Sequence, residues 1–309
     1  MKKDFLSIAD LTRDEISEIF DLAKTLKAKQ KAGEPHPYLA GKTLAMIFQK
    51  PSARTRVSFE VGMFQLGGHA LYVGPNDIQL GKRESFGDVA QTLSRYVDLI
   101  MARLFGHEDI LELARHATVP VINGLTDLLH PCQIMADLFT IYEKRDPKPE
   151  LKIAYIGDGN NVANSWVNMA AKIPMKLHLA CPQEYEPNSE ILSNARRTGV
   201  SEIKTIRDPF EAAHDADVLY TDVWASMGQE AEAARRKLVF RNYRIDQELL
   251  KAAKPNCLVM HCLPVHRGDE ITDDVIDGPH SIVFDEAENR LHVQKAIMVK
   301  LLGKPIIAK

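Results

Sequence analysis

The sequence is poor in the features that mark secreted, membrane-bound and nucleic-acid-binding proteins. Its 309 residues include only four cysteines, too few and too scattered for a disulfide framework. No stretch reaches the roughly 18 uninterrupted apolar residues of a membrane span, and the N-terminal lysines precede no apolar signal-peptide core. The net charge of −3 gives no general attraction to nucleic acid or to membrane surfaces. We therefore expect a cytoplasmic globular protein that binds neither.

The alternation of apolar and amphipathic segments predicts an α/β protein. A chain of this length exceeds one ordinary domain, and short β-rich runs alternate with helical patterns along all of it. Expected strands in the first half cover 43–48, 69–74, 97–103 and 119–124, with helices near 53–66, 85–96, 107–116 and 131–143. A second series of strands begins with LKIAYIGDG and continues with KLHLA, EIKTI, DVLYTDVW and CLVMHCLP. We predict two doubly wound parallel-sheet lobes with a cleft between them.

Two segments predict how the lobes are connected. The stretch 143–150 is charged and broken by prolines, as in a hinge. A long helix is expected over 285–302, with Asp285 near its N-cap, and it can cross back onto the first lobe. The first domain should therefore comprise 1–142 and 288–309, and the second 150–287.

The motif SARTR carries two arginines and several hydroxyls directly after an expected strand. Pro51 favours a helix start there, so free N–H groups of a first helical turn would point at one spot. The helix dipole makes that spot favourable for an anion, and cations in a first turn otherwise oppose the dipole. We expect Arg54 to be an anion ligand with the turn around it, and Arg56 to form an ordinary ion pair.

The motif HPCQ opens the expected helix at 131–143. Pro131 suits the first helical position, which leaves His130 at the N-cap region and Gln133 one turn along. Imidazole and carboxamide groups can bind the carbonyl and amine of a small ligand. A histidine that merely caps its own helix is the alternative.

The motif GDGNN follows a strand and opens a helix, as in dinucleotide-binding proteins. Val162 occupies the third glycine position of that fingerprint, so the motif is incomplete and nucleotide binding is not favoured. The amides of Asn160 and Asn161 instead lie where open α/β sheets bind small ligands. The motif DVWASMG lies at a similar strand end, where Asp222 can hold an amine, while Ser226 and Met227 can present polar groups to a carboxylate. A helix cap is the alternative for this stretch.

The motif HCLPVHRG also follows a strand. A thiol beside a histidine can serve as acid, base or nucleophile, which makes Cys262 a candidate, although a buried inert cysteine is also possible. Adjacent His261 and Cys262, with His130 and Cys132, do not have zinc-ligand spacing. We therefore predict no metal.

These five motifs, in this order along the whole chain, resemble the carbamoyltransferase family, in particular its ornithine-specific members. The family transfers the carbamoyl group of carbamoyl phosphate to ornithine, giving citrulline and phosphate. The resemblance implies the same reaction here, no metal or organic cofactor, and a homotrimer or a multiple of trimers. It also implies a carbamoyl-phosphate-binding first domain and an ornithine-binding second domain.

The resemblance assigns site residues by their positions in the motifs and in three further segments of the chain. Carbamoyl phosphate would be bound by Ser52, Ala53, Arg54, Thr55, Gln79, Arg103, His130, Gln133, Cys262, Leu263 and Arg290. Ornithine would be bound by Asn161, Asp222, Ser226 and Met227. The catalytic groups would be Arg54, Arg103, His130 and Cys262. Gln79 belongs to a loop, 75–85, that in the family completes the phosphate site of a neighbouring subunit.

One departure and several alternatives accompany this interpretation. The family usually has threonine where this chain has Ala53, so one hydroxyl donor is lost while the backbone N–H remains. HCLP and SMG favour ornithine over aspartate or putrescine, and Asp222 suits a charged amine better than an acylated nitrogen. Transfer to one of those other amines, a non-catalytic protein that binds an amino acid and phosphate, and a dehydrogenase are the alternatives.

Overall fold

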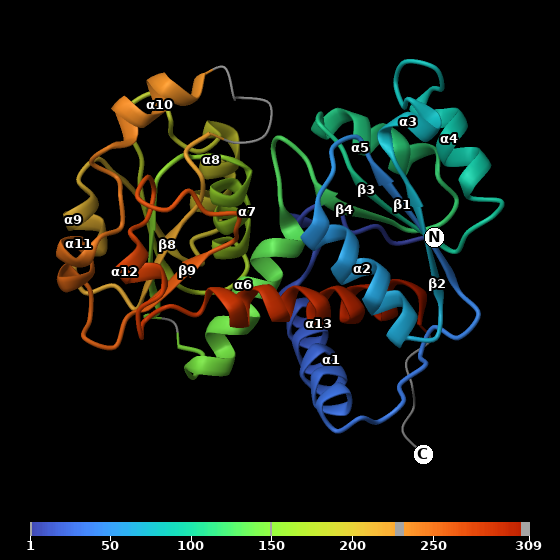
Figure 1. Ribbon diagram of the computed structural model, residues 1–309, viewed down its shortest axis with the longest axis horizontal. Helices are drawn as coiled ribbons and strands as arrows, with labels where there is room; N and C mark the ends of the chain where they lie inside the picture. Colours follow the sequence, from blue (N-terminus) through green and yellow to red (C-terminus); the bar gives the residue numbers. More distant parts are fainter. Residues whose placement is uncertain (1, 149, 226–231, 304–309) are drawn as a thin grey trace. The chain divides into compact units, whose positions relative to one another are not determined.

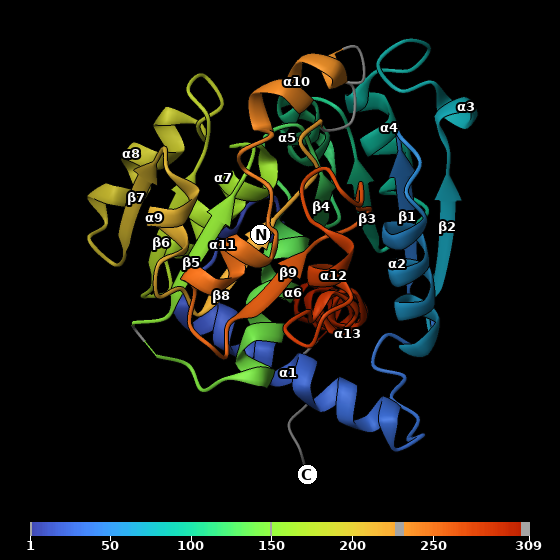
Figure 2. The same cartoon turned by 60° about the vertical axis from the view of Figure 1, so that its left-hand side comes forward.

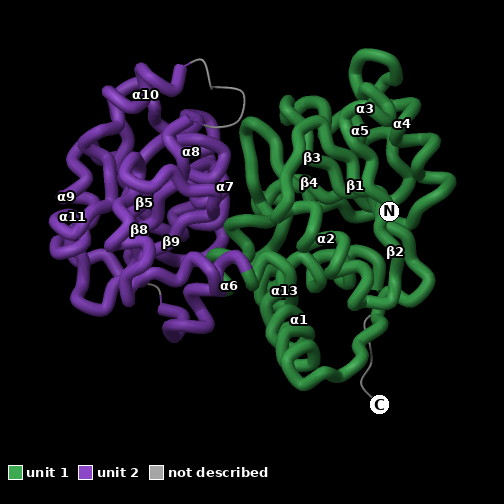
Figure 3. Tube along the Cα trace, in the orientation of Figure 1, with its two compact units in different colours: residues 1–139, 288–309 green, residues 140–287 purple. Residues whose placement is uncertain are grey.

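The computed structural model describes residues 2–148, 150–225 and 232–303. The chain forms two compact units, coloured separately in Figure 3: unit 1 contains 1–139 and 288–309, and unit 2 contains 140–287. The divisions fall inside the helix Pro131–Lys144 and inside the helix Val283–Leu302, whereas the sequence placed the first division in the segment 143–150. The assignment of one substrate to each unit stays a prediction.

Unit 1 is built on a parallel sheet with the strand order β2-β1-β3-β4 (Figure 1). The strands are β1 (Thr43–Phe48), β2 (His69–Val73), β3 (Leu99–Arg103) and β4 (Val121–Leu125). The helices that begin in this unit are η1 (Ile8–Asp10), α1 (Arg13–Lys31), α2 (Ala53–Gln65), α3 (Pro75–Ile78), α4 (Phe86–Leu93), α5 (His107–His116) and α6 (Pro131–Lys144).

Both faces of this sheet are covered. Successive residues of a strand point to opposite faces, so Ala45 and Ile47 of β1 face one side and Leu44 and Met46 the other. The first side forms one apolar cluster with α4 and α5. Helix α2 contacts β2 and runs along the sheet (Figure 2). The sheet is therefore an internal layer, as expected for a doubly wound fold.

Unit 2 contains a parallel sheet with the order β7-β6-β5-β8-β9. Its strands are β5 (Lys152–Ile156), β6 (Lys176–Ala180), β7 (Glu202–Ile206), β8 (Val218–Thr221) and β9 (Leu258–His261). The helices are α7 (Asn161–Ala170), α8 (Ser189–Arg197), α9 (Pro209–Ala213), α10 (Ala233–Phe240), α11 (Gln247–Ala252), α12 (Asp273–Ile276) and α13 (Val283–Leu302), which continues into unit 1. One face of this sheet packs on α9 to α12. On the other face, the rings of Trp166 of α7 and Tyr220 of β8 meet edge-on, with their centres 5.6 Å apart.

Each sheet has a point where the strand order reverses. In unit 1 the chain proceeds from β1 to β2 on one side and then places β3 on the other side of β1. In unit 2 it proceeds from β5 through β6 to β7 and then places β8 beside β5. Connections diverge at such switch points and leave a crevice beyond the carboxyl ends of the two central strands, where open α/β sheets bind ligands.

The local elements expected from the sequence are confirmed, with small differences at their ends. The strand over 43–48 has the predicted bounds, and Thr12 and Glu15 form a capping box at the start of α1. The C-terminal helix begins at Val283, two residues before the predicted start. Val283 is 2% exposed and packs into the core of unit 2. The helix therefore starts earlier in the chain than expected, and Asp285 lies in its first turn. Among the described helices, none is both long and apolar enough to cross a bilayer.

A buried lysine ties α13 to two other elements of unit 1. Lys295 is fully buried and its Nζ donates to Gln30 Oε1 at 3.0 Å and to Gln65 Oε1 at 2.9 Å. His36 donates from Nδ1 to a backbone carbonyl, so its Nε2 accepts the third bond at 3.2 Å. Burial lowers the pKa of Lys295 to about 8. Helices α1, α2 and α13 are therefore joined by one amine that titrates in the mildly alkaline range.

This shift predicts how the stability of the fold depends on pH. The folded state holds the Lys295 proton less tightly than the unfolded chain, so the free energy of unfolding should rise between pH 8 and 10.5. The expected gain is on the order of 1–2 kcal/mol once partial hydration of the amine is allowed for. Urea unfolding of the wild type and of Lys295→Met at pH 7.5 and 10 measures it. If the gap between the two proteins stayed constant with pH, the assignment would be wrong.

Candidate functional site

Residues 52–55 form the first turn of α2, as predicted, and this segment is called the anion turn here, although anion binding by it stays a prediction. Ser52 is the N-cap with extended backbone, and its Oγ accepts the Thr55 N–H at 3.4 Å and donates to Thr55 Oγ1 at 3.2 Å. The N–H groups of Ala53 and Arg54 open the helix and have no acceptor within it. An anion could accept hydrogen bonds from these two N–H groups. Ala53 would provide only its backbone N–H, because it has no side-chain donor.

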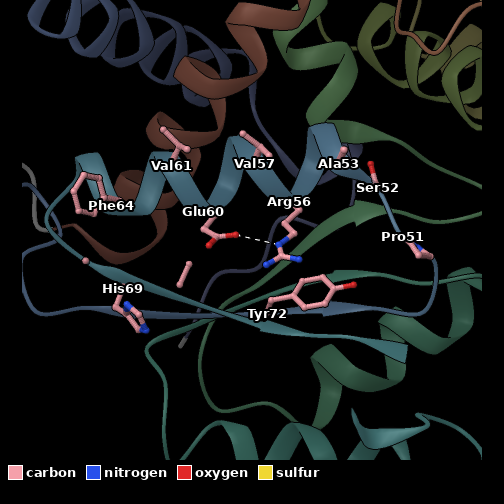
Figure 4. Close-up of a pocket in the computed structure, with 12 residues that line it drawn as sticks. Pro51, Ser52, Ala53, Arg56, Val57, Glu60, Val61, Phe64, His69 and Tyr72 are labelled. Carbon is pink, nitrogen blue, oxygen red and sulfur yellow. Dashed lines mark hydrogen bonds and ion pairs between the residues drawn. The ribbon is translucent and has the colours of Figure 1, made fainter. Parts of the chain in front are cut away.

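The two arginines of the motif have different environments, as the sequence predicted. Arg56 donates to Glu60 one turn along at 3.2 Å, and its guanidinium lies 4.1 Å from the centre of the Tyr72 ring (Figure 4). Arg54 is exposed and lies in the anion turn. Arg56 is thus held on the outer face of α2, whereas Arg54 remains the anion-ligand candidate.

Arg103 ends the strand beside β1 and is buried. The registers pair it with Phe48, the last residue of β1, and Gln49 donates its backbone N–H to the Arg103 carbonyl at 3.0 Å. The pairing with β4 is irregular between Ala102 and Arg103, and such irregularities change the direction of a side chain. The switch point of unit 1 therefore places Arg103 beside the segment that leads into the anion turn.

His130 lies within the electrostatic field of three arginines. It is 6% exposed, and its pKa lies well below the usual value, mainly because burial disfavours the charged ring. The positive charges of Arg290, Arg103 and Arg54 lower it further, in that order. At neutral pH the ring is uncharged, so it can donate one hydrogen bond and accept another. These four residues, which the resemblance assigned from separate parts of the sequence, are thus brought together in unit 1.

Gln133 and Arg290 form a buried pair. Arg290 Nη1 donates to Gln133 Oε1, and Gln133 Nε2 donates to Asp137 Oδ1 at 2.8 Å. The pair joins α6 to α13, two elements whose relation the sequence does not show. Sequence reasoning missed Asp137, although its position one turn after Gln133 indicates the contact.

Gln79 is not brought to this group by its own chain. It is exposed, follows the short helix α3 and has a left-handed backbone with φ of 45°, which is uncommon for a residue other than glycine. The N–H groups of Lys82 and Arg83 bond its carbonyl, so the loop is a tight turn. In the part of the chain that the structure describes, its side chain bonds none of the other predicted ligands.

In unit 2 the two glycines of GDGNN are needed for the backbone conformation and for close packing. Gly157 has φ of 138°, a conformation that other residues rarely adopt, and a Cβ on Gly159 would lie 2.2 Å from Pro187 N. Asn160 caps α7 by accepting the Val162 N–H at 2.9 Å. These are packing and capping roles, so the glycines are explained without a nucleotide.

Asp222 follows β8 at the switch point of unit 2 and is 6% exposed. Asn160 Nδ2 donates to its Oδ2 at 2.7 Å, while the Val223 N–H and the Cys262 thiol bond its Oδ1 at 2.8 and 3.0 Å. The carboxylate is thus oriented from both strands that border the switch point, and from β9. A carboxylate fixed in this way can accept hydrogen bonds from a positively charged amine and balance its charge.

The segment after β9 is positioned by His261. The Leu263 N–H donates to its Nδ1 at 2.9 Å, so the proton is on Nε2, which faces Glu270 Oε1 at 3.1 Å. Leu263 has φ of 57°, a strained conformation for a bulky residue. The strain is maintained by this buried histidine, and it turns the chain directly after Cys262.

Asp222, His261 and Cys262 bring three potential metal ligands within 4.8 Å of one another. A metal needs a free lone pair on the imidazole, and His261 already uses its lone pair for the Leu263 N–H. The remaining pair, a thiol hydrogen-bonded to a carboxylate, suits proton exchange with an amine better than it suits an ion.

The remaining ornithine-site predictions are only partly described. Asn161 is 8% exposed and begins α7, next to the Asn160 that orients Asp222. Ser226 and Met227 lie outside the described residues. Beyond that gap, Arg236 of α10 bonds Asp158 and the Trp224 carbonyl, each at 2.8 Å.

Comparison with known proteins agrees with the predicted resemblance. Residues 3–143 match the model of the aspartate/ornithine carbamoyltransferase carbamoyl-P binding domain, and residues 149–301 match that of the Asp/Orn binding domain. The chain is 56% identical over 302 residues to the ornithine carbamoyltransferase of Syntrophus aciditrophicus, covering 98% of this chain and 100% of the relative.

Solved structures are similar over the same extent. The ornithine carbamoyltransferase from Pyrococcus furiosus superposes with a TM-score of 0.93 at 52% identity, covering 99% of this chain and 98% of that one. The anabolic ornithine carbamoyltransferase from Campylobacter jejuni gives a TM-score of 0.92 at 39% identity, covering 97% and 98%.

The environment of His130 makes a spectroscopic prediction. Because burial and three arginines lower its pKa, the ring should remain neutral at pH 6, where an ordinary imidazole is largely charged. Arg290 has the largest effect of the three arginines, so Arg290→Met should raise the His130 pKa toward, but not to, its usual value, since burial is the larger cause. Histidine 15N NMR spectra over pH 5–8 test this. A charged His130 at pH 6 in the wild type would refute it.

Proposed function

The chain belongs to the aspartate/ornithine carbamoyltransferase family, and from that premise we propose that it transfers the carbamoyl group of carbamoyl phosphate to the side-chain amine of L-ornithine. The products are L-citrulline and phosphate. The observation that carries the proposal is the gathering of Arg54, Arg103 and Arg290 around a neutral His130 in one unit. A carbamoyl phosphate, which combines a dianion with a carbonyl, suits such a group.

The donor would be held by the anion turn and the groups around it. Its phosphate would accept the N–H groups of Ala53 and Arg54, with the guanidinium of Arg54 and the side chain of Arg103 adding positive charge. The carbamoyl end would be bound by His130 and the Gln133–Arg290 pair. These donors would also stabilise negative charge on the carbonyl oxygen as the amine adds. Phosphate then leaves with its charge already compensated.

The acceptor amine must lose a proton before it can attack. With a pKa near 10.4, forming the neutral amine at pH 7 costs about 4–5 kcal/mol. We assign this step to the hydrogen-bonded pair of Asp222 and Cys262, in which the Asp222 carboxylate attracts the ammonium and accepts its proton, while the Cys262 thiol donates to the same carboxylate. Asn161, Ser226 and Met227 are assigned to the rest of the amino acid, and Leu263 to the reacting carbamoyl group.

A groove on unit 1 supports assembly into trimers. It has a volume of about 860 Å³ and lies along the outer face of α2 and the edge strand β2, where Val57, Val61 and Phe64 are 56%, 37% and 78% exposed (Figure 4). Contiguous apolar patches of this kind usually mark protein interfaces. We assign the groove to a second copy of this chain, because the exposed Gln79 loop follows β2 and bonds none of its own chain's predicted ligands among the described residues. A neighbour would then receive Gln79 into its phosphate site.

The cellular setting completes the proposal. All four cysteines, Cys132, Cys181, Cys257 and Cys262, are free thiols, which suits a reducing compartment such as the cytoplasm. A direction toward citrulline, and hence arginine biosynthesis, is supported by the similarity to the anabolic enzyme of Campylobacter jejuni.

The two arginines of the first motif provide a paired test of the activity. Arg54→Ala removes a guanidinium from the phosphate site and should lower kcat/KM for carbamoyl phosphate at least 100-fold, about 3 kcal/mol of transition-state stabilisation. Arg56→Ala removes an ion pair and a ring contact on the outer face and should cost less than tenfold. Citrulline formation with ornithine as acceptor measures both, with aspartate and putrescine as negative controls. Equal, mild losses in the two variants would contradict the assignment, and wild-type protein without citrulline formation would refute the function.

The groove predicts a variant that dissociates the assembly. Phe64→Asp places a charge on its most exposed apolar residue and should convert trimers to monomers, with loss of activity because the neighbour's Gln79 is removed. Phe210→Asp, at a 49% exposed phenylalanine of unit 2, is the matched control and should stay trimeric. Size-exclusion chromatography with light scattering distinguishes the two. An unchanged mass for Phe64→Asp would rule out this interface.

A further inference from the structure

A chain of hydrogen bonds in unit 1 joins the anion turn to the carbamoyl-binding pair through side chains outside the five motifs. We call it the donor relay. Its members, from α2 through α13 to α6, are Thr55, Ser58, Gln294, Arg290, Gln133 and Asp137. Gln294, Gln133 and Asp137 are each at most 2% exposed, so the relay is buried over most of its length. Gln294 lies at its centre.

The carboxamide of Gln294 satisfies its neighbours in one orientation only. With its oxygen toward Arg290, it accepts from Nε at 3.1 Å and from Nη2 at 2.8 Å, and its nitrogen then donates to Ser58 Oγ at 2.6 Å. In the opposite orientation the Gln294 nitrogen would face the Arg290 N–H groups, and its oxygen would face Ser58 Oγ, whose hydrogen is already donated to Thr55. Gln294 therefore fixes one edge of the Arg290 guanidinium and at the same time links α13 to α2.

At its α2 end the relay reaches the anion turn. Ser58 Oγ donates to the Thr55 carbonyl at 3.2 Å while it accepts from Gln294. Thr55 in turn holds Ser52 through its N–H and its hydroxyl. A shift of Gln294 therefore has a direct route of hydrogen bonds to the residues that would bind phosphate.

At its α6 end the relay orients Gln133. Arg290 Nη1 donates to Gln133 Oε1, so the Gln133 nitrogen is directed to Asp137, which as a carboxylate can only accept. Both ends of the Gln133 carboxamide are thereby assigned. Arg290 is held by Gln133 on one side and by Gln294 on the other.

We propose that Gln294 is a positioning residue that keeps the phosphate-binding turn and the carbamoyl-binding pair at a fixed separation. Carbamoyl phosphate has to contact both at once, so a fixed separation lets the second contact form without further loss of freedom. Gln294 acts through Arg290 and Ser58 and bonds no substrate. This inference rests on the proposed function, because it assumes which groups the two halves of the site bind.

The variant Gln294→Met removes the three hydrogen bonds while preserving length and burial. Calorimetry should show about tenfold weaker binding of carbamoyl phosphate, which needs both halves, and less than threefold weaker binding of inorganic phosphate, which needs only the anion turn. In the citrulline assay kcat/KM for carbamoyl phosphate should fall about tenfold or more, with KM for ornithine unchanged within twofold. Equal losses for both ligands, or none, would overturn the proposal.

Gln65→Met is the matched control. Gln65 also joins α2 to α13, through Lys295 at 2.9 Å, but lies outside the relay. It should lower the free energy of unfolding without changing the ratio of the two affinities. If it produced the same loss of carbamoyl phosphate binding, a general loosening of α2 against α13 would explain the result and Gln294 would have no special role.

Ser58→Ala provides a milder variant should Gln294→Met fold poorly. It cuts only the α2 end of the relay and should weaken carbamoyl phosphate about threefold, and combined with Gln294→Met it should add nothing, because both break the same link. Additive effects would contradict the relay. Binding does not depend on turnover, so a wild type that bound carbamoyl phosphate but made no citrulline would refute the proposed function while leaving the test of Gln294 intact.

Discussion

The gathering of like charges around one neutral imidazole is the constraint on which the rest of unit 1 depends. Three guanidinium groups act on His130, and the N-terminus of α2 adds the positive end of a helix dipole. Such groups repel one another strongly where water is scarce. The fold opposes that repulsion by building Arg103 into a strand end and by bonding Arg290 to Gln133 and Gln294. A ligand with two negative charges would be attracted by the same positive field. The contacts that hold the arginines in place would therefore also prepare the site for the proposed donor.

Unit 2 has the opposite electrostatic character at its equivalent position. Its switch point presents the carboxylate of Asp222, oriented by Asn160 and bonded by Cys262. A carboxylate attracts an ammonium group and can accept a proton from it, and the Cys262 thiol donates to the same carboxylate. The predicted site residues of both units thus lie at the carboxyl ends of central strands, with arginines in unit 1 and a carboxylate in unit 2. This pairing would suit a donor that carries phosphate and an acceptor that carries an amine, as the proposed function requires.

Features governed by neighbouring residues were predictable. The capping box of Thr12, the start of α2 after Ser52 and the helix opened by Pro131 depend on contacts within one turn. The ion pair of Arg56 with Glu60 has the same local origin, and it explains why one arginine of the motif turns away. The start of α13 was misplaced, because burial of Val283 in the core of unit 2, rather than the capping preference of Asp285, decides where that helix begins.

What the sequence determined by itself is the set of elements, the doubly wound class and the residue types offered at each strand end, since these arise from periodicity and turn chemistry over short distances. Only the tertiary structure decided which of those residues meet. The contact of Gln294 with Ser58 and the support of Asp222 by Asn160 and Cys262 join segments tens to hundreds of residues apart. Such contacts depend on how strands order themselves in a sheet and how helices pack across it, and neither spacing nor composition encodes that order.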